Sequence, residues 1–195
     1  ESQHNFFRVV GFAGLMVGGN LNEVPKSNDG KLDWLAAIAL VPDERVRGEQ
    51  QASVVSLLSE SQPESVRKAA IAALAFMPEK NADLFRLVAR FLSEESLRTT
   101  AVRTLLSIPQ ESWPSDLAGS MVELLVNQAE ATPADKRTSD AFVDAMQLTD
   151  QLLAKLPVED ARAYRQRQRE ITVRVVRIQT VQEEMRYDTP YFAVE

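Results

Sequence analysis

The stretches SVRKAAIAALAFMP (residues 65–78) and SLRTTAVRTLLSIP (residues 96–109) carry the same pattern of side chains. Aligning residue 65 with residue 96 offsets one stretch from the other by 31 residues. The matching positions are Val66 with Leu97, Arg67 with Arg98, Ala70 with Ala101, Ile71 with Val102, Leu74 with Leu105 and Met77 with Ile108. The apolar matches recur with the spacing of one helix face, so the sequence predicts two equivalent amphipathic helices. The alanine positions would let a neighbouring helix approach closely.

Each of these two helices ends at a proline that follows an apolar residue. The same signal is found at LVP (residues 40–42), FMP (76–78), SIP (107–109) and KLP (155–157). Proline lacks an amide proton and disfavours the helical conformation of the residue before it, so each signal predicts a helix stop. Further helices are predicted over Arg47–Leu58, Asn81–Leu92, Ser115–Asn127 and Ala141–Leu156. Two-helix units of this kind cannot bury their apolar faces alone and are expected to stack.

The stretch from Pro63 to Pro78 resembles a HEAT repeat. The residues that carry the resemblance are Pro63, Val66, Arg67, Ala70, Ala73 and Leu74. The second copy keeps Leu97, Arg98, Ala101 and Leu105, but has Thr104 where the second alanine of the pattern would fall. The resemblance covers about residues 33–156. It implies a stacked α-α superhelix that presents successive helices to a protein partner.

The side-chain pattern changes near Arg169. Residues 158–170 are charged and helical in spacing, whereas ITVRVVRIQTV (171–181) alternates β-branched and polar residues, as strands do. Asp188–Pro190 is a predicted turn, and Tyr191–Val194 a further extended piece. The sequence therefore predicts a short C-terminal β element after the helices.

The tail RIQTVQEEMRYDTPYFAVE (177–195) resembles the opening of an azurin- or plastocyanin-like cupredoxin domain. The matching residues are Ile178, Thr180, Val181, Met185, Tyr187, Asp188, Phe192 and Val194. A helical array followed by a cupredoxin start is similar to large exported bacterial proteins of the membrane-bound-dehydrogenase or haem-binding type. This resemblance implies a periplasmic or other extracytoplasmic location, with the cytoplasm as the alternative.

No redox centre is expected in this chain itself. Blue copper needs two histidines and a cysteine, and covalently attached haem c needs the sequence Cys-x-x-Cys-His. The chain has no cysteine and a single histidine, His4, which is expected to be incidental. The copper or haem c of a parent protein would therefore lie outside this chain, and no metal ligands or cofactor-binding residues are predicted within it.

Composition and charge bear on the class of partner. The chain has 195 residues, of which 28 are acidic and 22 basic, with a formal net charge of -6. A nucleic-acid binder needs a positive face, so wholesale binding of nucleic acid is not expected. The longest apolar stretch, Phe6–Val17, is shorter than the roughly 20 residues that span a bilayer, so membrane insertion is not expected either. Because the chain begins with ESQHNFF rather than methionine, it is predicted to be a mature or excised piece.

Three other features have structural and functional interpretations, and the structural one is preferred for each. GFAGLMVGGN (11–20) fits neither a dinucleotide-binding nor a phosphate-binding loop, and is predicted to be a helix end or a turn. The adjacent carboxylates Asp43-Glu44, Glu94-Glu95 and Glu183-Glu184 are predicted to be solvated turns rather than catalytic pairs, and no catalytic residues are assigned. The segment Glu130–Asp140 is predicted to be a surface spacer.

One basic patch remains as a candidate site. It consists of Arg162, Arg165, Arg167, Arg169, Arg174 and Arg177. The patch could dock an acidic partner or domain, or bind nucleic acid. Alternatively, its arginines could pair with nearby Glu159, Asp160 and Glu170, or discourage the pairing of strand edges.

Together these patterns predict an all-α, HEAT-like α-α superhelix with a short C-terminal β element. Its predicted parts are an N-terminal capping segment (1–32), helical repeats (33–169) and a β tail (170–195) that begins a cupredoxin domain. The predicted function is a non-enzymatic scaffold for protein–protein or interdomain packing within a larger extracytoplasmic redox protein. The alternative is a fragment of an electron-transfer protein whose centres lie elsewhere. A dimer through the C-terminal strand is a further possibility.

Overall fold

The computed structural model describes residues 2–19 and 23–171, and within them every regular element is a helix. The all-α prediction is therefore confirmed. The chain divides into two compact units, unit 1 (Glu1–Pro114) and unit 2 (Ser115–Glu195). The α-helices are α1 (Ser2–Val17), α2 (Asn28–Ile38), α3 (Glu44–Glu49), α4 (Gln51–Ser56), α5 (Glu64–Leu74), α6 (Ala82–Ala89), α7 (Glu95–Leu106), α8 (Ser115–Ala131) and α9 (Asp140–Leu153). Short 3₁₀ turns are η1 (Arg90–Ser93), η2 (Gln110–Ser112) and η3 (Ala134–Lys136), and residues 158–171 form a further helix.

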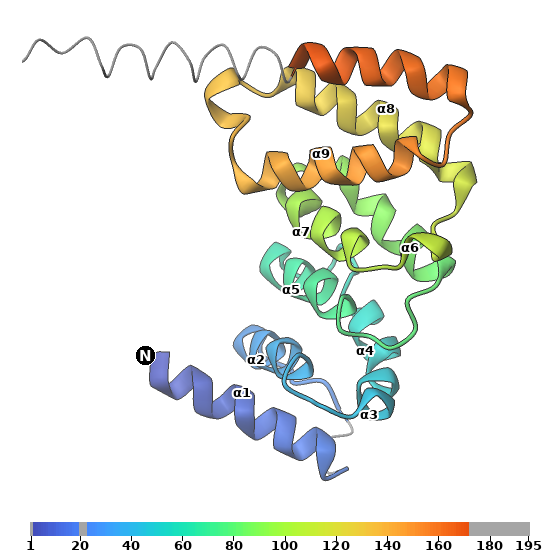
Figure 1. Ribbon diagram of the computed structural model, residues 1–195. Coiled ribbons are helices and arrows are strands. Elements are labelled where there is room, and N and C mark those ends of the chain that lie inside the picture. The colour runs from blue at the N-terminus through green and yellow to red at the C-terminus, as the bar shows by residue number, and fades with distance from the viewer. Residues whose placement is uncertain (1, 20–22, 172–195) are drawn as a thin grey trace, which may run out of the picture. The chain divides into compact units, whose positions relative to one another are not determined.

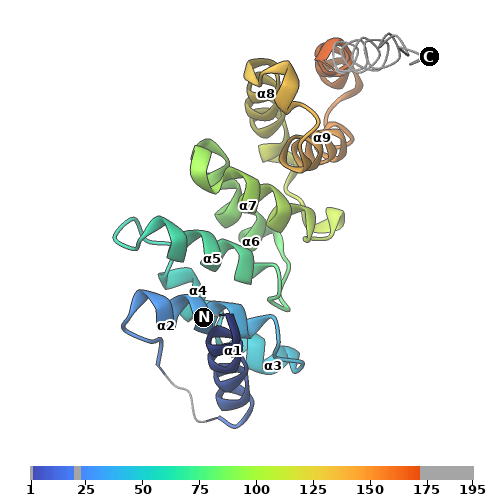
Figure 2. The same ribbon diagram turned by 90° about the vertical axis from the view of Figure 1, so that its left-hand side faces the viewer.

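Unit 1 is built around a row of stacked helices. In this row α1 packs on α2, α2 on α5 and α5 on α7, while α4 and α6 lie behind them against α5 and α7 (Figures 1 and 2). The apolar positions that the repeat predicts to be buried have no exposed surface: Val66, Ala70, Leu74, Leu97, Ala101 and Leu105. The buried stripe is therefore confirmed, and its alanines are buried in two helices that pack on each other, Ala70 in α5 and Ala101 in α7.

The helix stops are confirmed, but the helices end before the proline signals rather than at them. Helix α5 ends at Leu74, and its last turn tightens because the amides of Ala75, Phe76 and Met77 each donate to a carbonyl three residues earlier. A tightened last turn satisfies carbonyls that a regular helix end leaves without donors. The chain thus leaves the helix in one compact turn before Pro78.

Arginine side chains of one repeat donate hydrogen bonds to carbonyls at the helix ends of the preceding repeat, and the same contact occurs in two repeats. The Nε of Arg67 donates to the carbonyl of Leu58, and the Nε of Arg98 donates to the carbonyl of Leu92, over 3.3 Å and 2.8 Å. Leu58 and Leu92 hold the same place in the similar segments SLLSES (56–61) and RFLSEES (90–96). The two arginines of the repeat pattern therefore tie each first helix to the end of the preceding second helix.

A second set of hydrogen bonds points the other way along the row. Arg47 donates to the carbonyl of Phe76 over 2.8 Å, and Lys80 donates to the carbonyl of Ser107 over 3.2 Å. Phe76 and Ser107 are 31 residues apart, and each is the first residue of a proline signal. The period seen in the sequence therefore recurs in the contacts between repeats.

The second helix of each two-helix unit differs from its prediction in its bounds or in its buried residues. The helix expected over Arg47–Leu58 is divided into α3 and α4, and Asp43 begins α3 by accepting hydrogen bonds from the amides of Arg45 and Val46. Helix α6 buries Phe85, which the sequence analysis did not place in the core, against Trp113 at 5.1 Å between ring centroids. This aromatic pair packs α6 against the chain segment that follows α7.

The glycine-rich stretch 11–20 is only partly the predicted helix end. Gly11 and Gly14 lie inside α1, which ends at Val17. Gly19 follows with a φ of 68°, a conformation that favours glycine after a helix. The predicted capping segment 1–32 thus contains all of α1 and, after its N-cap Ser27, the first turn of α2.

Unit 2 consists of α8, α9 and the helix over residues 158–171, which lie alongside one another (Figure 1). Helix α8 continues to Ala131, into the predicted loop, and the loop then contains η3. Arg137 is buried in this loop and donates to the carbonyls of Thr132 and Glu130 at the end of α8. The segment is therefore held to the helix by its own arginine.

The predicted β tail begins at residue 170, but Glu170 and Ile171 are the last described residues of a helix, and Ile171 is buried. The β tail predicted from residue 170 is therefore wrong for these two residues, and the strand predicted from Ile171 is wrong for Ile171, because Ile171 continues the buried side of the helix. Residues 172–195 lie outside the described residues. The predicted strands, the cupredoxin start and a dimer through the tail fall there and stay predictions.

The departure of Thr104 from the repeat pattern has a structural reason and yields a prediction. Its buried hydroxyl donates to the carbonyl of Ile71 in α5 over 3.0 Å. We expect Thr104→Val to lower the free energy of unfolding of unit 1 by about 1–2 kcal/mol, because a buried carbonyl loses its donor. Both tryptophans of the chain, Trp34 and Trp113, are buried in unit 1, so urea denaturation followed by tryptophan fluorescence measures this unit.

Thr100→Val serves as the control for this measurement. Thr100 lies on the same helix and is only half-buried. The same substitution there should cost less than about 0.5 kcal/mol. Equal losses for the two variants would contradict the assigned role of the hydroxyl of Thr104.

Candidate functional site

The candidate arginines lie on different faces of one helix. Arg162, Arg165, Arg167 and Arg169 belong to the helix over residues 158–171, whereas Arg174 and Arg177 lie outside the described residues. At about 100° per residue, the spacing i, i+3 and i+7 places Arg162, Arg165 and Arg169 on one face. Arg167 points to another face, and the sequence-predicted patch is therefore divided in two.

Arg167 is engaged within unit 2. Its guanidinium binds the carboxylate of Glu130 with two hydrogen bonds of 2.8 Å, from Nε and Nη2. The same group donates to Asn127 over 2.6 Å and lies 3.4 Å from Glu123. Glu123, Asn127 and Glu130 follow one another at i, i+4 and i+7 on α8, so a single polar stripe of α8 receives this arginine. Bidentate arginine–carboxylate pairs combine charge with fixed geometry, and this one joins the last described helix to α8.

Tyr164 completes the contact between these two helices. Its ring centroid lies 5.9 Å from the guanidinium carbon of Arg167. A hydrogen bond between its hydroxyl and Glu123 lowers the pKa of the glutamate and raises the pKa of the tyrosine. The hydrogen bonds from Arg167 hold the pKa of Glu130 below its ordinary value of 4.5, and Glu130 in turn raises the pKa of Arg167. The cluster therefore favours its charged carboxylates and its protonated tyrosine.

These shifts predict the pH range in which the cluster is intact. A carboxylate whose pKa is lower in the folded chain stabilises the fold above its unfolded pKa, and this stabilisation is lost as the pH falls through the folded pKa. We therefore expect the Glu130 carboxyl to titrate below pH 4.5 in an NMR pH titration. Removing its partner with Arg167→Gln should move that titration upward, toward the ordinary value.

Arg162→Gln is the control, because Arg162 is exposed on the other face of the same helix. This variant should leave the Glu130 titration unchanged. If Arg162→Gln raised the Glu130 pKa as much as Arg167→Gln does, net charge rather than the direct contact would be responsible.

The pKa of Tyr164 is raised in the folded chain above its ordinary value of 10.0. The hydrogen bond of Tyr164 therefore stabilises the fold fully below pH 10.0, and this stabilisation is lost as the pH rises through the folded pKa.

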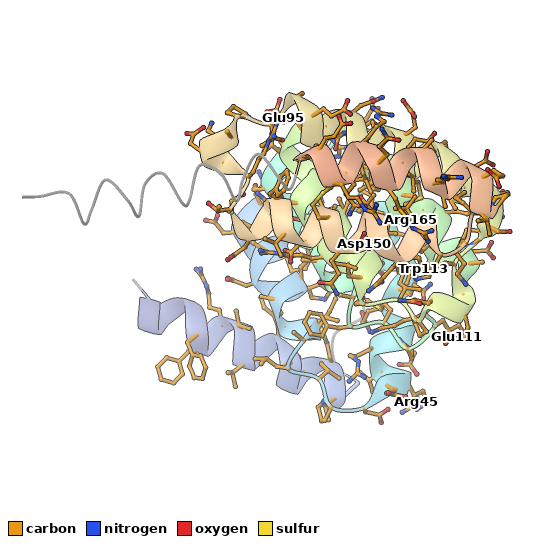
Figure 3. All side chains as sticks on the ribbon, turned by 45° about the horizontal axis from the view of Figure 1, so that its top comes forward. Arg45, Glu95, Glu111, Trp113, Asp150 and Arg165 are labelled. Carbon is orange, nitrogen blue, oxygen red and sulfur yellow. The ribbon has the colours of Figure 1, made fainter. Side chains whose placement is uncertain are left out.

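The other three arginines of this helix, Arg162, Arg165 and Arg169, are exposed. Together with Val158 and Gln166 they line an open groove of about 410 Å³, and we call these five residues the outer arginine face. Val158, at the start of this helix, is 76% exposed. Within the described residues, Arg162, Arg165 and Arg169 form no ion pair with a carboxylate, including the nearby Glu159, Asp160 and Glu170. Figure 3 marks Arg165 on this helix and Asp150 on α9.

Asp150 takes part in a different contact between helices. It accepts a hydrogen bond of 2.6 Å from the side chain of Gln168. Gln168 is the direct neighbour of Arg167, so successive residues of this helix reach α9 and α8. The helix is thereby held on two sides, and the outer arginine face is left on its remaining side.

The remaining sequence candidates have structural roles or stay undescribed. Asp43 caps α3, and Glu94 pairs with Arg67 over 2.9 Å. His4 lies in α1, and Glu183-Glu184 lies outside the described residues. Within residues 2–19 and 23–171, His, Asp and Glu side chains do not gather into a group of three or more that could hold a metal ion.

Comparison with known proteins finds no relative of this chain. None of the helices in the described part of the chain is both long and apolar enough to cross a membrane. The HEAT-like and cupredoxin-like resemblances of the sequence stay predictions. No family model, no curated protein and no solved structure matches this chain.

Proposed function

We propose that this chain is a non-enzymatic helical-repeat scaffold that docks an acidic segment of a partner protein or of a neighbouring domain on the outer arginine face. The observation that carries the proposal is the contrast within one helix. Arg167 is paired with Glu130 inside unit 2, whereas Arg162, Arg165 and Arg169 are exposed beside the apolar Val158. Arginine is enriched at protein–protein interfaces, and three arginines that form no ion pair within the described residues offer an acidic partner several charges on one helix face.

The chemistry of the outer arginine face favours a protein over nucleic acid. Arg162 and Arg169 are seven residues apart, so the three guanidinium groups cover about 10 Å of helix, enough for one or two turns of an acidic helix or a short acidic loop. Arginine binds carboxylates in a bidentate way and stacks on apolar and aromatic side chains. The chain has a net charge of -6, which opposes the approach of a polyanion as long as nucleic acid.

Site-specific cross-linking in cells that produce the protein tests this proposal. A photoreactive amino acid in place of Gln166 should form a cross-link to a segment rich in Asp and Glu. The triple variant Arg162→Glu, Arg165→Glu, Arg169→Glu should lower the yield about tenfold or more, because reversed charges repel an acidic partner. Arg45→Glu is the matched control, since Arg45 is exposed on α3 and pairs only along its own helix, with Glu49.

An unchanged cross-link in the triple variant would refute docking through the outer arginine face. A cross-link to nucleic acid that disappears steeply with added salt would favour the nucleic-acid interpretation instead. The wider setting, a periplasmic or extracytoplasmic redox protein with copper or haem c in other domains, is proposed from the sequence of the tail alone. If the cross-linked segment belonged to a domain that carries such a centre, this setting would gain direct support.

A further inference from the structure

The first residue of two successive proline signals is a bulky apolar side chain that is exposed. Leu40 is 50% exposed and Phe76 is 46% exposed. The next residue of each signal, Val41 or Met77, is buried. Single exposed apolar side chains are common on protein surfaces and need no explanation. Here, however, the same position of the repeat exposes a bulky apolar side chain twice in succession, which gives a row of two anchors.

The two turns that carry the anchors lie side by side, because one arginine binds both of them. The guanidinium of Arg47 donates to the carbonyl of Val41 over 2.6 Å and to the carbonyl of Phe76 over 2.8 Å. The second turn also contacts α3, since a Cβ placed on Gly48 would lie 3.2 Å from the Cγ of Pro78. The backbone beneath both anchors is therefore held in place within the fold, which lowers the entropy lost when a partner binds.

Exposed carboxylates surround the two anchors. The third proline turn (residues 107–109) adjoins the second, because Lys80 donates to the carbonyl of Ser107 over 3.2 Å. Ser107 is polar, so the row of apolar anchors ends at Phe76. The exposed carboxylates that follow the three turns are Asp43, Glu44, Glu79 and Glu111. We call these four carboxylates together with Leu40 and Phe76 the turn edge.

The cations next to the turn edge are engaged in contacts within the fold. Arg47 and Lys80 bind the backbone carbonyls of the turns. Arg45 pairs with Glu49 over 2.6 Å. In the described part of the chain, by contrast, neither Glu79 nor Glu111 forms an ion pair. The turn edge therefore combines exposed apolar groups with negative charge, and its charge is complementary to a basic partner.

We propose that the turn edge docks an extended basic segment of another protein. Apolar side chains at every third position of this segment contact Leu40 and Phe76, and the lysines or arginines between them pair with the carboxylates. The spacing favours an extended segment. Packed helices such as α2 and α5 lie about 8–10 Å apart, and three residues of a polyproline-type chain advance about 9 Å and return to the same side.

This surface is distinct from the outer arginine face. The turn edge belongs to unit 1, whereas the outer arginine face belongs to unit 2. The two surfaces also have opposite charge and require partners of opposite charge. Each proposal can therefore fail without the other.

Fluorescence polarisation of a labelled peptide of repeated Leu-Lys-Lys units tests the proposal on the whole chain. We expect a dissociation constant on the order of 100 μM at about 0.1 M salt. A peptide of repeated Ser-Lys-Lys units has the same charge but no apolar side chains, and should bind at least about tenfold more weakly. No binding of the Leu-Lys-Lys peptide at about 1 mM, or equal binding of the two peptides, would overturn the proposal.

The anchors are tested by the double variant Leu40→Ser, Phe76→Ser, which leaves the net charge unchanged. It should weaken binding of the Leu-Lys-Lys peptide about tenfold or more. Phe7→Ser, Leu15→Ser is the matched control, because it replaces the same two residue types at exposed positions of α1. Tryptophan fluorescence verifies that unit 1 stays folded in both variants. Equal weakening in the two would assign binding to apolar surface in general and refute the turn edge.

The carboxylates are tested separately with Glu79→Gln, Glu111→Gln. We expect binding of the Leu-Lys-Lys peptide to weaken about fivefold, as the loss of two exposed ion pairs predicts. The control Glu60→Gln, Glu95→Gln changes the net charge equally, but its residues are exposed at the opposite helix ends, before α5 and in the first turn of α7. If this control weakened binding as much, the overall charge of the chain would be responsible, and the proposal would be wrong.

Discussion

Replacing Leu74 by alanine is expected to lower the free energy of unfolding of unit 1 by about 3–4 kcal/mol. Leu74 has no exposed surface and lies in the last turn of α5, the helix that packs between α2 and α7. The truncation removes buried methyl groups and leaves a cavity in the core of unit 1. Rigid neighbours on both sides limit the collapse of this cavity, which is the condition for a cost toward the upper end of the observed range.

The measurement is urea denaturation followed by the fluorescence of the two tryptophans, both in unit 1. Leu40→Ala is the matched control, because Leu40 begins another of the proline signals but is 50% exposed. It should cost less than about 1 kcal/mol. If the two variants lost similar stability, the sequence repeat would not correspond to a packed core at Leu74.

Replacing Arg67 by leucine is expected to destabilise unit 1 by about 2–3 kcal/mol. The side chain is 12% exposed and makes three contacts at once. It donates to the carbonyl of Leu58 at the end of α4, pairs with Glu94 over 2.9 Å and lies 5.6 Å from the ring centroid of Phe91. Leucine keeps part of the packing but leaves a helix-end carbonyl and a carboxylate without their donor.

Arg67→Lys and Arg45→Leu test which of these contacts matters. Lysine keeps the charge but has neither the planar fork nor the Nε that reaches Leu58, so Arg67→Lys should recover less than half of the loss. Arg45 is exposed and pairs with Glu49 on its own helix, so Arg45→Leu should cost no more than about 0.5 kcal/mol. Full recovery in Arg67→Lys would assign the effect to charge alone.

Local periodicity accounts for the part of the fold that the sequence predicted. The spacing of Val66, Ala70 and Leu74 and the proline signals depend on residues close in sequence, and they lead correctly to helices with a buried stripe. The division between α3 and α4 was not predictable in this way, because Arg47–Gln51 contains no apolar side chain whose spacing would show where one helix ends and the next begins. Phe85 was missed because its partner Trp113 lies in a different segment of the chain.

The candidate site was predicted in composition but not in arrangement. Treating the arginines as one patch ignored that helical spacing turns Arg167 away from Arg162, Arg165 and Arg169. The predicted partners of the run were acidic residues nearby in sequence, whereas Arg167 binds Glu130, 37 residues earlier. The polar stripe on α8 was the available signal. It became meaningful only once the structure brought the two helices together.

The hydrogen bonds between repeats make unit 1 a row of nearest-neighbour couplings. Arg67 and Arg98 reach back to the preceding repeat, while Arg47 and Lys80 reach forward to the next one. In such a row the stability of each repeat includes the free energy of the contacts that it makes with its two neighbours. The central helix α5 packs on α2 on one side and on α7 on the other, so its amide protons should exchange with solvent more slowly than those of α1, for which only the contact with α2 is described.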